Sequence, residues 1–246
     1  NGQFPHNPEP LKQHLTDLSE KVVACNADFG IAVDPDVDRL AFMDEKGVMF
    51  GEEYTLVACA DYILSQRPGN TVSNLSSTRA LRDVTEKHGG TYTASAVGEV
   101  NVVNAMKATK AVIGGEGNGG IIYPESHYGR DALVGVALFL SLLAERKIAV
   151  STLRASYPSY FMSKKKIDLN PSIDVDAILV AMEAKYAHEQ ISTIDGVKID
   201  FATEWVHLRK SNTEAIIRIY TEAPSQEAAD VLADKIISEI RTVAVI

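Results

Sequence analysis

The sequence predicts a layered α/β fold that is followed by a smaller α+β domain. Helix-like and strand-like segments alternate with short connections over residues 51–150. Beyond a proline-containing link at 156–158, strand candidates cluster around two helices, which is typical of an antiparallel sheet. The composition, with 46% hydrophobic and 23% charged residues among 246, is that of an ordinary globular protein.

These patterns divide the chain into three segments, which we expect at residues 1–50, 51–156 and 157–246. In the first segment, four apolar side chains repeat at the spacing of one helical face: Leu11, Leu15, Leu18 and Val22. Two short β-like runs follow, at 30–33 and 40–43, and a glycine-containing turn at 45–47 ends the second run.

The second segment carries the alternating pattern. Helices are expected at 54–64, 80–87, 100–107 and 132–145. Strands are expected at 71–75, 91–95, 111–113 and 120–123. The apolar run at 132–144 is shorter than the roughly 20 residues that span a membrane, so we predict a buried helix and no membrane partner.

The third segment has a different rhythm. Strands are expected at 160–169, 196–201, 205–208 and 216–220. Helices are expected at 174–188, between the first two strands, and at 225–241, after the last. This order predicts an antiparallel sheet with helices, joined to the preceding layers by the proline-containing link.

Charge and cysteine content exclude several classes of protein. The formal net charge of −9 argues against a broad nucleic-acid-binding face. Two cysteines, Cys25 and Cys59, are too few for a disulfide scaffold. The chain opens at Asn1 without an initiator Met or a signal-peptide pattern, so we expect a part of a longer, cytoplasmic protein.

The first candidate site is the acidic loop Asp34-Pro35-Asp36-Val37-Asp38-Arg39. A flat strand would separate alternate carboxylates by about 6.7 Å, whereas the ligands of one Mg²⁺ lie about 2.1 Å from it. Pro35 prevents regular ladder pairing, which allows a loop that brings Asp34, Asp36 and Asp38 together. Oxygen ligands favour Mg²⁺, Mn²⁺ or Ca²⁺ over zinc. A polar turn whose carboxylates face water is the alternative.

The second candidate site is the glycine-rich loop at 114–120, directly after an apolar run. Its glycines would let Glu116 and Asn118 point outward from a tight turn, toward the hydroxyls of a sugar. A glycine-rich reverse turn without a ligand is the alternative. Downstream, His127 and Arg130 add a titratable group and a cation; we expect Arg130 to contribute to substrate binding.

The third candidate site is a polar loop that combines cationic and neutral donors: Arg209, Lys210, Ser211, Asn212 and Thr213. Arg218 follows on the next strand candidate. An arginine fork together with hydroxyl and amide donors suits a phosphate dianion. A solvated hairpin turn is the alternative.

Taken in order, the three loops resemble three of the four signature loops of the α-D-phosphohexomutase superfamily. The segments at 2–5 and 7–10 resemble the entry to the second domain of this family. Those at 97–102 and 127–131 most closely resemble its prokaryotic phosphoglucosamine mutase branch. The resemblance implies that Asp34, Asp36 and Asp38 ligate Mg²⁺ and that Arg39 faces the transferred phosphoryl group. It implies that Glu116 and Asn118 bind sugar hydroxyls, and that the third loop holds the non-reacting phosphate through Arg209, Ser211, Asn212, Thr213 and Arg218.

The same resemblance implies the tail of a second α/β domain at 1–50, a third α/β domain at 51–156 and a TATA-box-binding-protein-like α+β domain at 157–246. The family's fourth signature, a phosphoserine loop, is not found in this sequence; Thr93-Ala94-Ser95 lacks the His-Asn-Pro that would follow it. The chain therefore resembles a C-terminal portion without the first domain, and we expect it to be inactive by itself.

The implied activity is that of an isomerase, an Mg²⁺-dependent mutase acting on a hexose or hexosamine phosphate through a bisphosphate. Asn118 and Val100 depart from the mannose/glucose branch and favour a glucosamine phosphate. A phosphomannomutase/phosphoglucomutase and a non-catalytic metal- and sugar-phosphate-binding module are the alternatives. His127 is a candidate general base, and we expect a monomer or a homodimer.

Overall fold

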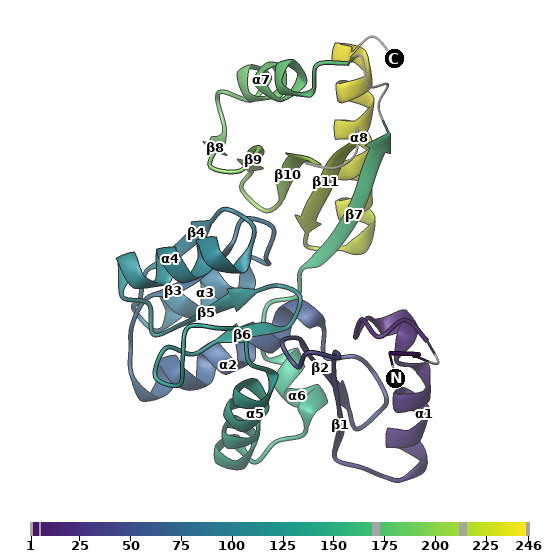
Figure 1. Ribbon diagram of the computed structural model, residues 1–246, viewed down its shortest axis with the longest axis vertical. Helices are drawn as coiled ribbons and strands as arrows, with labels where there is room; N and C mark the ends of the chain where they lie inside the picture. The colour runs from purple at the N-terminus through teal and green to yellow at the C-terminus, as the bar shows by residue number, and fades with distance from the viewer. Residues whose placement is uncertain (1, 5, 169–172, 212–215, 245–246) are drawn as a thin grey trace. The chain divides into compact units, whose positions relative to one another are not determined.

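The computed structural model describes residues 2–4, 6–168, 173–211 and 216–244. It separates into two compact units, residues 1–158 and 159–246 (Figure 1). The mixed α/β class predicted from the sequence is confirmed in both units.

The described part of the first unit contains a short 3₁₀ helix, six α-helices and six strands. The helices are η1 (Lys12–His14), α1 (Thr16–Ala24), α2 (Glu52–Gln66), α3 (Ala80–Lys87), α4 (Glu99–Thr109), α5 (Ala132–Arg146) and α6 (Val150–Ala155). The strands are β1 (Phe29–Val33), β2 (Leu40–Asp44), β3 (Thr71–Asn74), β4 (Tyr92–Ser95), β5 (Ile113–Glu116) and β6 (Gly120–Ile122). The six-residue helix α6 is absent from the sequence prediction.

The first two strands form an antiparallel hairpin in which Val33 pairs with Leu40 next to the connecting loop. Leu15, directly before α1, packs against this hairpin together with Leu18 and Val22 of the helix. The helix expected to begin near Leu11 begins only at Thr16, because Leu15 leaves helical geometry at φ −111° and ψ 22°.

The main sheet of the first unit has the strand order β4-β3-β5-β6, with β3 parallel to β4 and β5, and β6 antiparallel to β5. Adjacent residues of β3 point to opposite faces. The hydroxyl of Thr71 bonds that of Thr85 in α3, at 2.6 Å between oxygens, whereas Val72 packs with Met106 of α4. Helices therefore cover both faces, as in a layered α/β domain.

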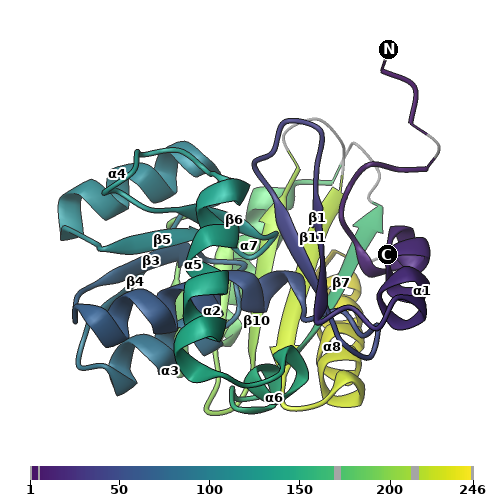
Figure 2. The same ribbon diagram turned by 90° about the horizontal axis from the view of Figure 1, so that it is seen from below.

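Helix α5 joins the hairpin to the main sheet. Its Phe139 stacks on Phe42 of β2, with ring centroids 3.8 Å apart, and α5 lies beside α2 (Figure 2). The prediction of a buried helix is wrong for one face, since Leu133 is 66% and Leu140 43% exposed. Among the described residues, no helix is both long enough and apolar enough to span a bilayer.

The end of the first unit is held by hydrogen bonds from the body of that unit. The hydroxyl of Tyr54 donates to the carbonyl of Pro158 at 2.6 Å. Arg154 lies over the ring of Tyr54, 3.4 Å from its centroid, and its Nε donates to the carbonyl of Phe50 at 3.0 Å. These contacts attach the last residues of the first unit to its body.

The described residues of the second unit form a five-stranded antiparallel sheet with two helices. Its strands are β7 (Phe161–Asp168), β8 (Gln190–Ser192), β9 (Val197–Asp200), β10 (Trp205–Lys210) and β11 (Ile216–Ala223), in the order β7-β11-β10-β9-β8. Its helices are α7 (Val175–Lys185) and α8 (Gln226–Ala244). The three-residue strand β8 is absent from the sequence prediction.

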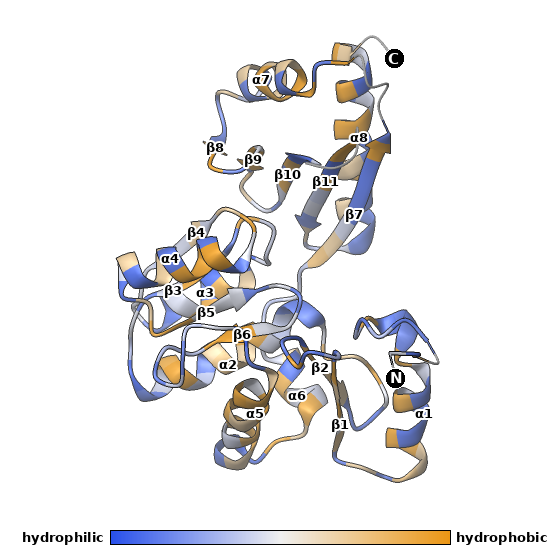
Figure 3. Ribbon diagram, in the orientation of Figure 1, coloured by the Kyte–Doolittle hydropathy of each residue, from blue (hydrophilic) through white to orange (hydrophobic). Residues whose placement is uncertain are grey.

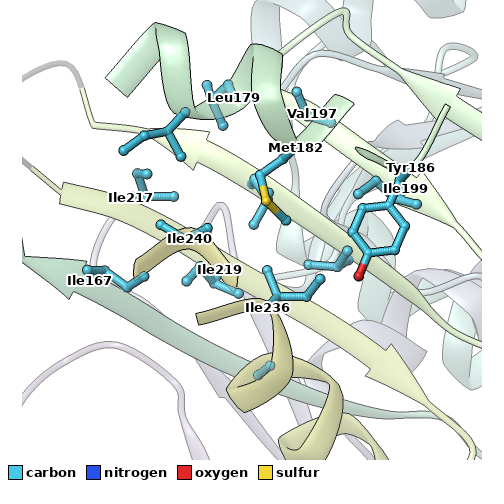
Figure 4. Close-up of a cluster of buried hydrophobic side chains, with 14 of the residues drawn as sticks. Ile167, Leu179, Met182, Tyr186, Val197, Ile199, Ile217, Ile219, Ile236 and Ile240 are labelled. Carbon is cyan, nitrogen blue, oxygen red and sulfur yellow. The ribbon is translucent and has the colours of Figure 1, made fainter. Parts of the chain in front are cut away.

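Both helices of the second unit pack on one face of its sheet. Met182 of α7 and Ile236 of α8 meet Ile199, Ile217 and neighbouring strand residues in one buried cluster (Figure 4). The lysine-rich strand β7 is hydrophilic along much of its length in Figure 3. This cluster gives the second unit a hydrophobic core of its own.

Candidate active site

The acidic loop connects β1 to β2 at the end of the hairpin. Asp34 is 8% exposed, and its Oδ1 accepts the backbone N–H groups of Asp38 at 3.0 Å and Arg39 at 2.9 Å. The side chain of Asp34 thus closes the loop on itself, in the way that aspartate stabilises turns.

The three carboxylates of this loop come close together. One oxygen from each of Asp34, Asp36 and Asp38 lies within 4.8 Å of the others. Such a set of oxygen donors fits a hard divalent cation such as Mg²⁺. Burial and the Asp34 carboxylate raise the pKa of Asp38 to about 6, against the opposing effect of Arg130. Burial would also raise the pKa of Asp34, but hydrogen bonds from the Arg39 and Asp38 backbone keep it below its usual value.

The acidic loop is hydrogen-bonded to the first turn of α5. Its Val37 adopts φ +60°, in the left-handed region that β-branched residues rarely enter. The carbonyl of Val37 accepts the backbone N–H of Ala132 at 3.0 Å. The loop conformation is therefore set by a neighbouring helix as well as by its own hydrogen bonds.

Arg39, the expected partner of the transferred phosphoryl group, lies between two sources of negative charge. Its Nη1 donates to Glu9 Oε1 at 2.5 Å. Its Nε lies 3.7 Å from Asp34 Oδ2 and 3.8 Å from Asp38 Oδ1. The guanidinium thus borders the acidic loop, and its side chain is 30% exposed.

The glycine-rich loop connects β5 to β6. Glu116 is only 6% exposed, so the expectation that it points outward is wrong. Its Oε1 accepts from Asn74 Nδ2 at 2.8 Å and from the Gly98 backbone at 3.2 Å. Asn118 is partly exposed, and its Oδ1 accepts the N–H of Gly120 at 3.2 Å. Burial of a carboxylate at Glu116 requires these donors and a counter-charge.

Arg130 provides that counter-charge and joins the two loops. Its guanidinium donates to Glu116 Oε2 at 2.9 Å and also to Asp38. Its Nε lies 3.2 Å from Glu99 Oε2, while its backbone N–H donates to Glu99 Oε1 at 3.2 Å. One guanidinium therefore serves three carboxylates from three separate segments.

Two glycines allow this close approach. Gly119 has φ +86°, and a β-carbon there would overlap the backbone carbonyl of Leu40. The N–H of Leu40 donates to the Gly119 carbonyl at 3.2 Å. A β-carbon at Gly120 would overlap the side chain of Arg130. The glycine content of the loop thus reflects contact with β2 and with Arg130.

His127, the candidate general base, lies in the connection before α5. Its Nε2 is 2.9 Å from Asp131 Oδ2, and its side chain is half exposed. Asp131 also caps α5, accepting the N–H of Val134 at 3.0 Å. Burial would raise the pKa of Asp131, but the hydrogen bonds from His127 and the helix N-terminus keep it below its usual value. The role of His127 stays a prediction.

The third loop belongs to the second unit, where β10 pairs with β11. Arg209 lies directly opposite Arg218 in this pair. Arg218 is in turn opposite Lys166 of β7, so three cations form one row across the strands. Arg209 Nε lies 3.1 Å from Asp195 Oδ2. A row of cations of this kind suits a dianion.

The turn between these two strands is described only in part. The backbone N–H of Ser211 donates to the carbonyl of Ile216 at 3.1 Å, which closes the hairpin. Asn212 and Thr213 lie outside the described residues. The structure therefore describes three of the five expected phosphate donors: Arg209, Ser211 and Arg218.

Sequence reasoning missed several residues that support the first two loops. Asn74, the last residue of β3, donates to Glu116, and its Oδ1 accepts from the Ser77 hydroxyl at 3.1 Å. That hydroxyl accepts the N–H of Gly117 at 3.0 Å. Glu99 pairs with Arg130 from the start of α4. These residues lie at or just after the carboxyl ends of the parallel strands β3 and β4. Ligands bind at such ends in α/β sheets, so the position of these residues along the sequence could have indicated them.

Comparison with known proteins identifies the family. Models of phosphoglucomutase/phosphomannomutase match residues 1–47 as alpha/beta/alpha domain II, residues 43–160 as alpha/beta/alpha domain III and residues 164–239 as the C-terminal domain. The chain belongs to the phosphoglucomutase/phosphomannomutase family. The resemblance seen in the three loops is thus confirmed over nearly the whole chain.

Two curated members of this family are similar along almost the full chain. A protein from Methanopyrus kandleri named "Probable phosphoglucosamine mutase" is 35% identical over 98% of this chain and 54% of its own length. A phosphoglucomutase/phosphomannomutase from Thermococcus kodakarensis is 36% identical over 93% of this chain and 50% of its own length. The chain thus spans about half the length of the curated relatives it matches.

A solved structure of a phosphoglucomutase/phosphomannomutase family protein from Burkholderia thailandensis has the same fold. It superposes with a TM-score of 0.85 at 26% sequence identity. The match covers 99% of this chain and 53% of that protein. The fold of the described residues is therefore that of the matching half of a family member.

Proposed function

We propose that this chain carries the metal, sugar and distal-phosphate loops of an Mg²⁺-dependent sugar-phosphate mutase. Its reaction would interconvert glucosamine 6-phosphate and glucosamine 1-phosphate through a bisphosphate. The main support is the pairing of Arg130 with both Asp38 and Glu116, because it unites a cation site and a sugar site in one unit. Family membership supports the same reaction class.

In this proposal each loop has a separate task. Asp34, Asp36 and Asp38 would hold Mg²⁺, which would offset negative charge on the transferred phosphoryl group. Arg39 borders the same loop and would orient that phosphoryl group through its guanidinium. Arg39 would have to exchange its ion pair with Glu9 for one with phosphate. In this exchange one anionic partner replaces another.

The remaining loops would bind the parts of the sugar that do not react. Glu116 and Asn118 would accept or donate hydrogen bonds to hydroxyl groups, and Arg130 would neutralise Glu116 while the site is closed to water. The row of Arg209, Arg218 and neighbouring donors would hold the distal phosphate. Binding energy from that phosphate would orient the reacting end.

The cation site is tested by calorimetric titration with Mg²⁺. We expect Asp36→Asn to abolish the binding heat, because it removes one of three converging carboxylates. Asp28→Asn is the matched control: it removes the same charge from an exposed position directly before the same hairpin and should leave the titration unchanged. Equal binding by wild type and Asp36→Asn would contradict the metal assignment.

The mutase reaction is tested by mixing this chain with a separately produced N-terminal half of the Methanopyrus kandleri relative, Mg²⁺ and a sugar bisphosphate. Neither half alone should interconvert glucosamine 6- and 1-phosphate, and the mixture should. An Asp36→Asn chain in the same mixture should be inactive. Turnover by this chain alone would contradict the expectation that its nucleophile is supplied elsewhere.

A phosphomannomutase/phosphoglucomutase is the second candidate, supported by the relative from Thermococcus kodakarensis. Relative rates on glucosamine, mannose and glucose phosphates in the same mixture separate the two. A third candidate, a non-catalytic binding module, predicts binding of Mg²⁺ and sugar phosphate without turnover in any mixture.

A further inference from the structure

Asp38 takes part in two sets of interactions at once. It is one of the three carboxylates that converge in the acidic loop. It is also the partner of Arg130, whose guanidinium reaches on to Glu116 in the glycine-rich loop. The contact joins residues 92 positions apart in the chain. A single carboxylate is therefore shared by the cation site and the sugar site.

The charges at this junction do not balance. Arg130 faces Asp38, Glu99 and Glu116. Arg39 adds a second positive charge 3.8 Å from Asp38, so two arginines still face three carboxylates. The side chain of Arg130 is only 15% exposed, so water screens these charges weakly. A divalent cation at Asp38 would supply the missing positive charge. It would also repel the Arg130 guanidinium, because both would approach the same carboxylate.

We propose, on the basis of the proposed function, that Arg130 couples cation binding to sugar-phosphate binding. Mg²⁺ and the guanidinium are alternative counter-charges for Asp38. When the cation binds, the ion pair between Arg130 and Asp38 breaks. The guanidinium then turns toward Glu116 and the anionic ligand beside it. A sugar phosphate that draws the guanidinium in the same direction makes Asp38 more available to the cation.

This coupling is reciprocal. If sugar phosphate tightens Mg²⁺ binding by some factor, Mg²⁺ must tighten sugar-phosphate binding by the same factor. Arg130 acts here through its two partners, so it is a positioning residue as well as a binding one. A planar fork is needed to reach two carboxylates at once, which a lysine ammonium cannot reproduce.

The test is calorimetric titration of the chain with Mg²⁺, with and without saturating glucosamine 6-phosphate. For the wild type we expect sugar phosphate to lower the Mg²⁺ dissociation constant at least about fivefold. Arg130→Met removes the competing charge and should bind Mg²⁺ roughly tenfold more tightly without sugar phosphate. In this variant the two dissociation constants should become equal.

A second substitution at Arg130 separates the effect of its charge from that of its geometry, and a substitution at Arg67 is the control. Arg130→Lys keeps a positive charge without the fork, so its Mg²⁺ affinity should stay close to that of the wild type while the coupling disappears. If circular dichroism shows that Arg130→Met is unfolded, Arg130→Lys by itself tests the coupling. Arg67→Met is the matched control, since Arg67 is half exposed and pairs with Glu125 at 2.5 Å; it should behave as wild type.

The outcomes distinguish this proposal from the proposed function. If wild type binds Mg²⁺ but Arg130→Met and Arg130→Lys show the wild-type affinity and the wild-type response to sugar phosphate, the coupling by Arg130 is wrong and the metal site stands. If wild type binds no Mg²⁺, the proposed function is contradicted, and the coupling with it.

Discussion

At the scale of single residues, the ion pair between Asp38 and Arg130 joins the acidic loop to a distant segment of the chain. The types of Asp34, Asp36 and Asp38, and their spacing, indicate an oxygen-ligand cation site without any structure. Nothing local in the sequence indicates that Asp38 pairs with Arg130, because the two are 92 positions apart. Contacts of that separation depend on the tertiary fold.

The environment of Glu116 also depends on partners that the sequence does not indicate. Its glycine-rich surroundings suggest an outward-pointing side chain, yet it is buried. The reason is that donors from Asn74, Gly98 and Arg130 converge on it from three other segments. A carboxylate with that many donors is stable inside the protein, whereas one without them would be driven to the surface.

The two cysteines should differ sharply in reactivity. Complete burial in α2 raises the pKa of Cys59 to about 12, whereas Cys25 is exposed. A thiol with a raised pKa stays protonated, so any stability it contributes is present below its ordinary value of 9.0 and is lost as pH rises toward 12. We expect a thiol reagent at pH 8 to modify one cysteine in the native chain and two after unfolding.

The variant Cys25→Ser assigns these thiols. It should show no rapid reaction in the native state and one equivalent in denaturant. Rapid modification of native Cys25→Ser would contradict the burial of Cys59. The measurement is absorbance or mass spectrometry of the labelled chain.

At the scale of elements, long periodic segments could be predicted and very short ones could not. The helices α2, α5 and α8 follow from apolar periodicity over fifteen or more residues each. The strand β8 has three residues, and α6 has six, so neither contains enough of a period to recognise. Their formation depends on pairing and packing with elements elsewhere in the chain.

The exposed face of helix α5 differs from the prediction for a related reason. Its sequence is apolar on nearly every side, which predicts complete burial. The structure buries the face that carries Phe139 and leaves Leu133 and Leu140 exposed. Hydropathy measures how favourable the burial of a side chain would be. Which face of the helix is buried depends on the neighbouring elements.

The glycine-rich loop yields a prediction at this scale. Gly119→Ala should lower the free energy of unfolding by more than the roughly 1–2 kcal/mol that a left-handed residue costs, because the new β-carbon would also overlap the Leu40 carbonyl. Gly89→Ala is the matched control, with φ +75° and no atom within 4 Å of the added carbon. Urea unfolding measures both.

The difference between these variants isolates the contact with Leu40. Equal losses for Gly119→Ala and Gly89→Ala would mean that the glycine-rich loop does not depend on its approach to β2. A larger loss for Gly119→Ala, together with weaker Mg²⁺ binding, is the expected result. The carbonyl of Gly119 accepts the N–H of Leu40, the residue after the acidic loop.

At the scale of the whole molecule, the chain divides into two compact units between Pro158 and Ser159. The division into 1–50, 51–156 and 157–246 remains our proposal for the domain boundaries. The broad class of each part could be predicted because alternating and clustered strands lead to different layer arrangements. The order of strands within each sheet could not, since it depends on pairings between distant segments.

The second unit should fold by itself. Its buried cluster draws only on residues 167–240, so residues 159–246 contain their own core. We expect this fragment to unfold cooperatively, and Ile236→Ala to lower its free energy of unfolding by about 2–5 kcal/mol. Val231→Ala, on the same helix but 63% exposed, should change it by less than about 0.5 kcal/mol.

Thermal unfolding followed by circular dichroism provides the measurement. A broad, non-cooperative transition for residues 159–246 would contradict an independent core. So would equal effects of Ile236→Ala and Val231→Ala. The comparison needs no knowledge of the ligand, because it concerns only packing.

The left-handed backbone conformation of Val37 places thermal stability and affinity for Mg²⁺ in opposition. Val37 lies between two of the three converging carboxylates, in a backbone conformation that glycine or asparagine adopts more readily. A laboratory selection for thermal stability alone would therefore favour Gly or Asn at this position. The relaxed loop would hold its carboxylates less rigidly, so the same lineage would lose affinity for Mg²⁺ as it gained heat resistance.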